Sequence, residues 1–176
     1  MVWVRAHARQ FKVDPQRIAL LGESAGGHLV SFAGARAKAS TRVAAVVSFY
    51  GPHDFAARAE QHGRLAESLK AFLGLAELND AAQRSMREAS PITYVHKDMP
   101  PYLLIHGTAD STVPYDQSVR MCDRMKQAGA SCEIFAVQGA PHGVGPWEKT
   151  PEFQGYKGKM VEWLGQTLGA GQAAAR

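Results

Sequence analysis

Three side chains in this 176-residue chain are suited to act together in chemistry, and each stands near glycine or proline. Ser24 stands in GESAG, Asp110 in HGTADSTVP and His142 in APHG. A serine hydroxyl becomes a good nucleophile only when a base removes its proton, and a histidine does this when a carboxylate holds its ring in the right tautomer. The three residues are therefore candidates for a nucleophile, an acid and a base.

The segment around Ser24 matches the pattern G-x-S-x-G. The pattern is weak alone, but a strand-like run at residues 17–21 (RIALL) precedes it and a helix-like run to about Ala39 follows it. This order is the setting of a nucleophile elbow, in which side chains at both glycine positions, 22 and 26, would collide with neighbouring backbone. The amide of Ala25, at the start of the helix, would then face a developing oxyanion. The alternative is that Ser24 only caps the helix.

Asp110 and His142 each follow a predicted strand. Asp110 comes after YLLIH and His142 after CEIFAV, and parallel sheets place their sites at the carboxyl ends of strands. Asp54, which follows the strand VAAVVSFY, is a rival acid. His106 is expected to position the loop of Asp110, and His28 to pack within the helix after Ser24. The remaining histidines stand in no recognisable catalytic or metal-binding motif: His7, His53, His62 and His96. Of these, His53 could line the mouth of the site.

These motifs resemble the α/β-hydrolase superfamily, and more closely its esterase and lipase branch of acetyl-ester, feruloyl-ester and related carboxylesterases. The resemblance runs from about Val2 to Leu168. It implies a serine hydrolase that cleaves small-molecule carboxylic esters of short-chain or acetyl type through an acyl-enzyme on Ser24, with Asp110 as acid, His142 as base and no cofactor. Two alternatives stay open: a catalytic fragment of a prolyl-oligopeptidase-type serine peptidase, and a truncated half-domain without catalysis.

The resemblance also predicts parts that this stretch of sequence lacks. α/β-Hydrolases form the oxyanion hole from the amide after the nucleophile and from a loop after the third strand, in esterases often of HGGG type. Only 23 residues precede Ser24, and none of them resembles that loop. We therefore expect a truncated chain that forms the C-terminal half of the fold. Of the two amides of the oxyanion hole, it would contain only that of Ala25. The strand at 17–21 would then lie at an open edge that invites self-association.

Strand-like and helix-like segments alternate, which predicts an α/β fold of about four parallel strands with crossover helices. Residues 1–168 are expected to form one partial α/β-hydrolase domain with a helical insertion at about 54–90, and residues 169–176 a flexible tail. The expected strands are 17–21, 43–50, 102–106 and 132–137, and the expected helices are 2–11, a helix from the turn at 22–27 to about 39, 114–129 and 152–168.

The composition excludes several classes of protein. Hydrophobic residues make up 45% and charged residues 20% of the chain, which is typical of a globular domain. The net charge of +4 comes from scattered basic residues, unlike a nucleic-acid surface. No apolar run reaches the roughly 18 residues of a membrane span, and no signal peptide is visible. The compartment therefore stays open: secreted or periplasmic if a signal precedes this sequence, and cytoplasmic otherwise.

Two cysteines, Cys122 and Cys132, do not have the spacing of a zinc site, and no metal-ligand motif such as HExxH is present, so we expect no metal. They are either two small buried side chains or a disulfide that joins a helix to the strand after it. A disulfide would imply an oxidising compartment. The sequence leaves both alternatives open.

Overall fold

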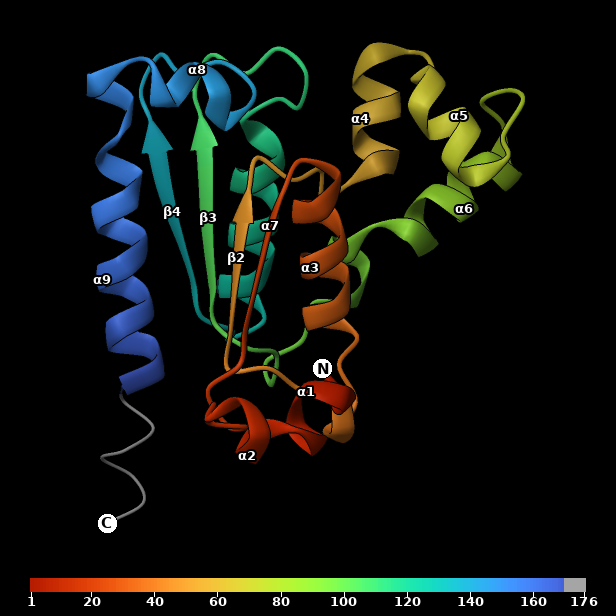
Figure 1. The fold of residues 1–176 in the computed structure, drawn as a ribbon. Helices are drawn as coiled ribbons and strands as arrows, with labels where there is room; N and C mark the ends of the chain where they lie inside the picture. Colours follow the sequence, from red (N-terminus) through yellow and green to blue (C-terminus); the bar gives the residue numbers. More distant parts are fainter. Residues whose placement is uncertain (170–176) are drawn as a thin grey trace.

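The computed structural model describes residues 1–169 (Figure 1). Its centre is a four-stranded parallel sheet in the order β1-β2-β3-β4, so each strand pairs with the next strand along the chain. The prediction of an α/β fold with four parallel strands and crossover helices is confirmed. The predicted tail lies outside the described residues, except for Gly169, which ends the last helix. The strands are β1 (Ala19–Glu23), β2 (Ala45–Phe49), β3 (Tyr102–Gly107) and β4 (Cys132–Val137).

The boundaries of several elements differ from those expected. The strand expected at 17–21 continues to Glu23, because its pairing with β2 extends up to the turn. The helix expected at 2–11 is two short helices that meet at His7. The described helices and 3-10 turns are α1 (Val2–Ala6), α2 (Ala8–Phe11), α3 (Ala25–Ala35), η1 (Ala39–Thr41), α4 (Phe55–His62), α5 (Glu67–Leu73), α6 (Asp80–Ala89), η2 (Pro91–Tyr94), α7 (Asp116–Gln127), α8 (Val144–Glu148), η3 (Pro151–Phe153) and α9 (Gly155–Gly169).

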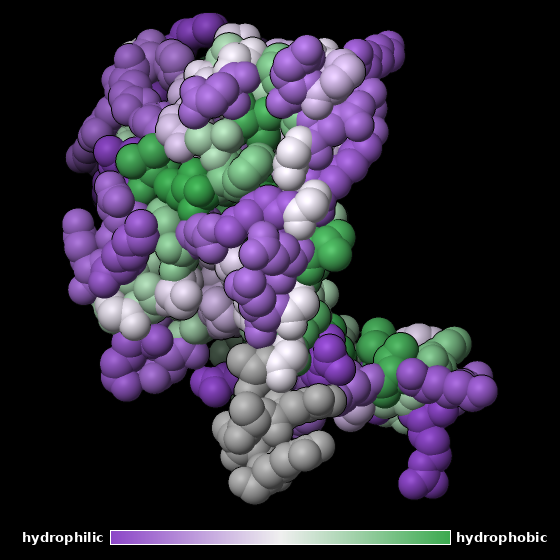
Figure 2. Space-filling view, turned by 90° about the vertical axis from the view of Figure 1, so that its left-hand side faces the viewer, coloured by the Kyte–Doolittle hydropathy of each residue, from purple (hydrophilic) through white to green (hydrophobic). Residues whose placement is uncertain are grey.

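Helices cover both faces of the sheet, which explains why its central strands are continuous apolar runs. Every residue of β2 and β3 is buried. Alternate strand residues point to opposite faces, so Val46 and Leu104 pack towards α3 and α7, whereas Val47 and Leu103 pack towards α8 and α9. Figure 2 views the molecule from the side of α9, where hydrophilic residues predominate with hydrophobic ones between them. The packed layers hold the strand ends, and the loops that follow them, in fixed positions.

The strand β1 lies at the edge of the sheet, as the sequence predicts. It pairs with β2, and no second partner strand lies beside it within residues 1–169. Leu21, in the middle of β1, is 55% exposed. An apolar strand edge with free backbone groups favours pairing with a further strand. Self-association through this edge stays a prediction.

The segment expected to form a helical insertion contains α4, α5 and α6. These helices lie beside the upper end of α3 in Figure 1, away from the sheet. They share a small core of their own, in which Phe55 and Ala59 of α4 contact Leu69 of α5 and Met86 of α6. Asp54 and Asn79 cap α4 and α6 by accepting hydrogen bonds from the amides three residues later. The segment therefore folds as a helical lobe at one end of the sheet.

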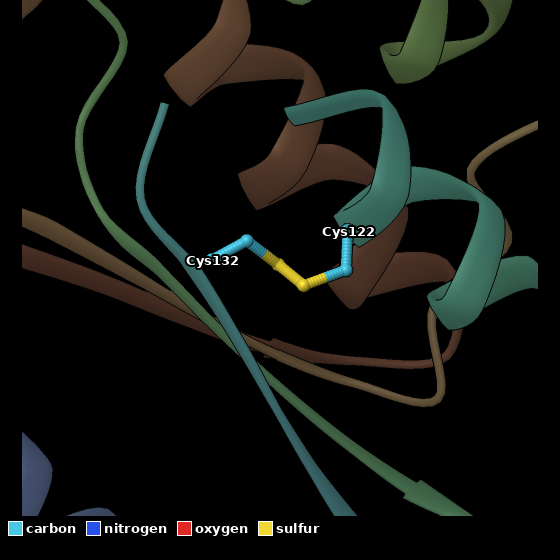
Figure 3. The surroundings of a disulfide bond; sticks show 2 residues. All are labelled: Cys122 and Cys132. Carbon is cyan, nitrogen blue, oxygen red and sulfur yellow. A yellow bond between two sulfur atoms is a disulfide. The ribbon is translucent and has the colours of Figure 1, made fainter. Parts of the chain in front are cut away.

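A disulfide joins Cys122 of α7 to Cys132 at the start of β4 (Figure 3). The two Cα atoms lie 5.4 Å apart, within the usual range for this bond. Of the two alternatives that the sequence leaves open, the structure therefore shows the disulfide. Cys122 is fully buried in the core between α7 and the sheet, and Cys132 is partly buried. The bond fixes the C-terminal part of α7 to the strand that leads towards His142.

None of the helices described combines the length and the hydrophobicity that a membrane span requires. No group of three or more histidine, cysteine, aspartate or glutamate side chains within residues 1–169 is arranged to hold a metal ion.

Candidate active site

The turn that carries Ser24 leads from β1 directly into α3, with Ser24 as the one residue between them. Ser24 has φ of 51° and ψ of −116°, a backbone conformation that is strained for any residue other than glycine. Its amide donates to the carbonyl oxygen of Phe49 at 2.9 Å, which ties the turn to the end of β2. The Ser24 side chain makes no capping hydrogen bond to α3. The alternative in which Ser24 only caps the helix is therefore wrong.

Glycines are needed at this turn, but not at both of the positions predicted. A Cβ atom on Gly22 would lie 2.3 Å from the carbonyl oxygen of Gly26, so the prediction for Gly22 is confirmed. A Cβ atom on Gly26 would meet nothing within 4 Å among the described residues, so that prediction is wrong. The second crowded glycine is Gly27, where a Cβ would lie 2.7 Å from the Ser48 hydroxyl, because α3 crosses close to the end of β2 there.

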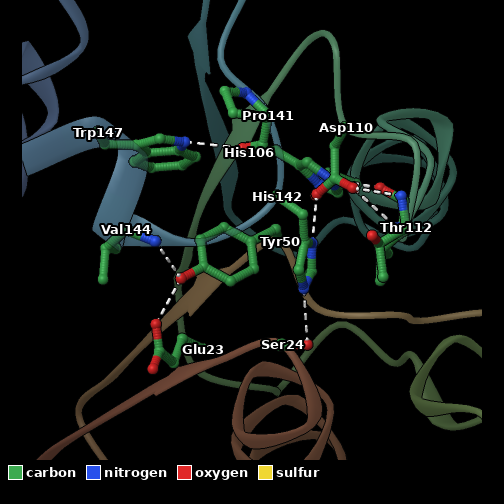
Figure 4. A network of polar contacts seen from close by, with 12 residues as sticks. Glu23, Ser24, Tyr50, His106, Asp110, Thr112, Pro141, His142, Val144 and Trp147 are labelled. Carbon is green, nitrogen blue, oxygen red and sulfur yellow. Dashed lines mark hydrogen bonds and ion pairs between the residues drawn. The ribbon is translucent and has the colours of Figure 1, made fainter. Parts of the chain in front are cut away.

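The three candidate residues lie in a continuous chain of contacts (Figure 4). The Ser24 hydroxyl oxygen lies 2.9 Å from Nε2 of His142. The other ring nitrogen, Nδ1, lies 2.6 Å from Oδ2 of Asp110. If the imidazole carries its proton on Nδ1, it donates to Asp110 and leaves Nε2 free to accept the serine proton. Residues far apart in the sequence thus meet at the carboxyl ends of β1, β3 and β4.

The carboxylate of Asp110 is held by backbone donors and a second histidine. Its Oδ1 accepts hydrogen bonds from the amides of Thr112 and Val113, both at 2.8 Å. Nε2 of His106 lies 3.4 Å from Oδ2. Burial by itself raises the pKa of Asp110, but the hydrogen bonds from His106, His142 and Val113 outweigh it and lower the pKa to about 2. Asp110 is therefore ionised wherever His142 could act as a base.

Two buried side chains fix the loops around Asp110 and His142. The ring of His106 contacts the carbonyl oxygen of Val113 at 2.9 Å and the hydroxyl of Ser118 at 2.7 Å, so it positions the Asp110 loop as expected. Trp147, fully buried in α8, donates from its indole nitrogen to the carbonyl oxygen of Pro141 at 2.8 Å. This second bond fixes the residue directly before His142.

The rival acid, Asp54, is engaged elsewhere. One of its carboxylate oxygens accepts a hydrogen bond from the amide of Ala57 at 3.0 Å, as the cap of α4. The other oxygen accepts from the guanidinium of Arg120 at 2.9 Å. His142 contacts Asp110 and not Asp54 among the described residues. The structure therefore brings Asp110, and not Asp54, to the histidine.

The other buried histidines have separate surroundings. The ring of His28 contacts the carbonyl oxygen of Ala89 at 2.8 Å, and burial lowers its pKa. His28 packs as expected, but it also lines the pocket beside Ser24. His53 is fully buried against Ser31 and Ser48, and burial lowers its pKa to about 3. The suggestion that His53 lines the mouth of the site is therefore wrong.

The contacts of Tyr50, beside the site, were not predicted from the sequence. The hydroxyl of Tyr50 donates to the carboxylate of Glu23, the residue before Ser24, and accepts from the amide of Val144 at 3.0 Å (Figure 4). The Tyr50 ring lies edge-on to that of His142, with 4.7 Å between the ring centroids. Burial and the neighbouring carboxylate raise the pKa of Tyr50, so the phenol stays protonated as a donor. The position of Tyr50 at the end of a strand, before Gly51-Pro52, was the available signal.

A pocket of about 350 Å³ opens on Ser24. Its walls come from the start of α3, from the helical lobe and from the loop after Asp110. The lining is mainly apolar, which suits a small uncharged group. The lining residues are Ser24, Ala25, His28, Leu29, Pro52, Phe55, Arg58, Ser68, Leu69, Phe72, Thr112 and Val113.

The sequence is similar to those of known esterases. The BD-FAE family matches residues 1–125. A probable carboxylic ester hydrolase, LipM of Mycobacterium tuberculosis, is 33% identical over 146 residues, which are 77% of this chain and 34% of LipM. Esterase LipC of the same organism is 32% identical over 156 residues, which are 81% of this chain and 38% of LipC. The chain therefore spans about a third of the length of these curated relatives.

The fold is similar to those of solved esterase structures. A truncated carbohydrate esterase from gut microbiota superposes with a TM-score of 0.77 at 28% identity, over 95% of this chain and 65% of that one. An acetyl ester-xyloside bifunctional hydrolase from Caldicellulosiruptor lactoaceticus gives 0.74 at 27% identity, over 93% and 62%. Esterase 2 of Thermogutta terrifontis gives 0.71 at 28%, over 94% and 60%, and has also been solved with propionate and with butyrate bound. With the match over residues 1–125, these likenesses show that the chain belongs to the BD-FAE family of α/β-hydrolase esterases.

Proposed function

We propose that this chain carries the catalytic residues of a serine carboxylic ester hydrolase, with Ser24 as nucleophile, His142 as base and Asp110 as acid. The observation that carries the proposal is the series of contacts from the Ser24 hydroxyl to His142 at 2.9 Å and from His142 to Asp110 at 2.6 Å. A hydroxyl, an imidazole and a buried carboxylate in this order supply the parts that acyl transfer needs.

The chemistry follows from the positions of these atoms. Nε2 of His142 takes the serine proton as Oγ of Ser24 attacks the ester carbonyl, and the imidazolium that forms is stabilised by the anionic Asp110. The carbonyl oxygen becomes negative, and the amide of Ala25 at the first position of α3 has no carbonyl one turn earlier to bond, so it can donate to that oxyanion. His142 then gives its proton to the leaving alcohol, and the acyl group stays on Ser24.

The second half of the reaction uses the same groups. A water molecule gives a proton to His142 and attacks the acyl carbon, the bond from that carbon to Oγ of Ser24 breaks, and the proton returns to the serine. The products are a carboxylic acid and an alcohol. The water needs no further base, because His142 accepts its proton as it accepted the proton of the serine.

We propose short-chain esters as substrates. The pocket on Ser24 has a volume of about 350 Å³ and is lined by apolar side chains such as Leu29, Phe55 and Phe72. Esterase 2 of Thermogutta terrifontis, to which this chain is similar, binds propionate and butyrate. Both observations favour a small acyl group. The pocket is lined by α3 and by the helical lobe at 54–90, so the partial domain and its insertion would form the two walls of one site.

The test is a panel of nitrophenyl esters of increasing acyl length beside a prolyl-amide substrate. We expect turnover of the acetyl to butyryl esters, a decline for long chains and little turnover of the amide. Ser24→Ala should remove the turnover of every ester. Faster cleavage of the amide than of the short esters would support the peptidase alternative, and turnover that survives in Ser24→Ala would refute the proposal.

We further propose that the edge of β1 pairs with β1 of a second copy, which its free side and the exposed Leu21 support. Leu21→Lys should shift the chain towards monomer in analytical ultracentrifugation. A wild-type chain that sediments as a monomer at all concentrations would refute this.

A further inference from the structure

A second hollow lies next to the pocket that opens on Ser24. It has a volume of about 220 Å³ and lies between α4, α5 and the residue that follows Asp110. The two hollows share Phe55, Arg58 and Leu69 in their walls, so they meet at these side chains. The second hollow is therefore the neighbouring space for a substrate whose carbonyl lies at Ser24.

The second hollow differs from the first in its charge. Arg58, Arg64 and His62 contribute to its wall, together with the hydroxyl of Ser111. The acidic residue of the wall, Glu67, is already bound by Nζ of Lys70 at 2.8 Å. The wall therefore carries two guanidinium groups and one carboxylate that is already paired, and low-dielectric walls strengthen the field of such charges.

Arg58 lies in the walls of both hollows. One of its terminal nitrogens donates to the carbonyl oxygen of Thr112 at 2.7 Å, which holds the guanidinium beside the loop that follows Asp110. Burial lowers the pKa of Arg58, but a guanidinium keeps its charge near neutral pH.

We propose that the second hollow is a subsite for an anionic group, such as a carboxylate, sulfate or phosphate, on the ester that reacts at Ser24. This proposal rests on the proposed function of Ser24. Arg58 supplies a positive charge and N–H donors for such a group, and Arg64 adds a second positive charge. The apolar pocket accepts any small acyl or alcohol part. The charged hollow selects the esters that carry an anionic group beyond that part.

The first test measures binding without turnover. N-phenylsuccinamic acid and N-phenylbutanamide differ in that a carboxylate replaces a methyl group, and both are amides that this site should not cleave. Each is titrated into residues 1–176 and followed by NMR. We expect the acid to bind at least about tenfold more tightly than the neutral amide, with a preference that falls as salt is added.

Two variants and one control assign the preference to this hollow. Arg64→Gln removes a charge from the hollow and leaves the bond from Arg58 to Thr112 in place, whereas Arg58→Gln removes both. Each should reduce the ratio of the two affinities several-fold, to near one in Arg58→Gln. Arg84→Gln, on the same helical lobe but outside both hollows, should leave the ratio unchanged. Equal affinities in the wild type, or a ratio that survives in both variants, would overturn the proposal.

The second test measures selectivity in turnover, with 4-nitrophenyl butyrate against mono-4-nitrophenyl succinate. To place the charge on the alcohol side instead, 4-acetoxybenzamide is compared with 4-acetoxybenzoate. We expect kcat/KM to favour the anionic member of at least one pair, and Arg58→Gln and Arg64→Gln to remove that preference. Equal values within both pairs would overturn the proposal. Absence of all turnover would instead refute the role of Ser24, and the binding result would then still decide whether the subsite exists.

Discussion

Replacement of Asp110 by asparagine changes a single atom type in the proposed site, and its consequence can be worked out from the contacts. Oδ1 of Asp110 accepts from two backbone amides, at Thr112 and Val113, and Oδ2 faces Nδ1 of His142. An asparagine has one oxygen and one NH₂ group to meet these partners. If the oxygen stays on the two amides, the NH₂ group faces His142, donates to Nδ1 and moves the ring proton to Nε2. That tautomer cannot accept the proton of Ser24.

The opposite orientation keeps the productive tautomer but directs the NH₂ group at the two backbone amides. The buried amide of Val113 and the partly buried amide of Thr112 would then be unsatisfied, at a cost of about 2–5 kcal/mol for the pair. The asparagine therefore rests in the unproductive orientation, and reaching the productive one costs this free energy. The expected fall in kcat is about 30-fold to 5 × 10³-fold, since each 1.36 kcal/mol is a factor of about ten.

The assay is steady-state hydrolysis of a short nitrophenyl ester, with Asp54→Asn as the matched control. Asparagine caps a helix about as well as aspartate, and the partly exposed pair with Arg120 contributes little, so Asp54→Asn should keep kcat within about twofold of wild type. Circular dichroism should show both variants to be folded. A larger loss for Asp54→Asn than for Asp110→Asn would refute the assignment of the acid.

Three further predictions follow from contacts around the site. Tyr50→Phe leaves the amide of Val144 and the carboxylate of Glu23 without their partner, so we expect a loss of about 1–3 kcal/mol in urea unfolding and a fall in kcat with little change in KM; unchanged stability would contradict this. Reduction of the disulfide, which closes a loop of 10 residues, should cost about 3 kcal/mol in the same assay, and an unchanged midpoint in dithiothreitol would count against it. Because the pKa of Asp110 lies at about 2, below its usual 3.8, its contribution to stability is present above pH 4 and is lost as the pH falls towards 2. The acid unfolding of Asp110→Asn should therefore show a smaller dependence on pH over this range, and an identical dependence would contradict the linkage.

The sheet and the three candidate residues were predictable from the sequence because each depends on local patterns. The strands are continuous apolar runs, and loops with glycine or proline follow them at the positions of Ser24, Asp110 and His142. The topology of a parallel sheet then brings these loops to one edge. Periodicity and turn chemistry carry this information without knowledge of distant contacts.

Other features depend on contacts between residues that are distant in the sequence, and the pattern does not encode them. Tyr50 reaches Glu23, 27 residues away, and Val144, 94 residues away. Gly27 is crowded by Ser48 because α3 crosses β2, whereas Gly26 faces open space. The charge of the second hollow arises only when α4 and α5 fold beside the loop after Asp110. Such features require the packed structure.

The most direct test of the central claim is covalent labelling of the folded chain by a fluorophosphonate, with the modified peptide identified by mass spectrometry. The reagent captures a serine hydroxyl that a neighbouring base has activated. We predict one adduct per chain, on Ser24, and no adduct in Ser24→Ala. His142→Gln should retain Ser24 but slow the labelling by orders of magnitude, because its side chain cannot act as a base. Equal labelling of Ser24→Ala, or labelling of His142→Gln at the wild-type rate, would contradict the account.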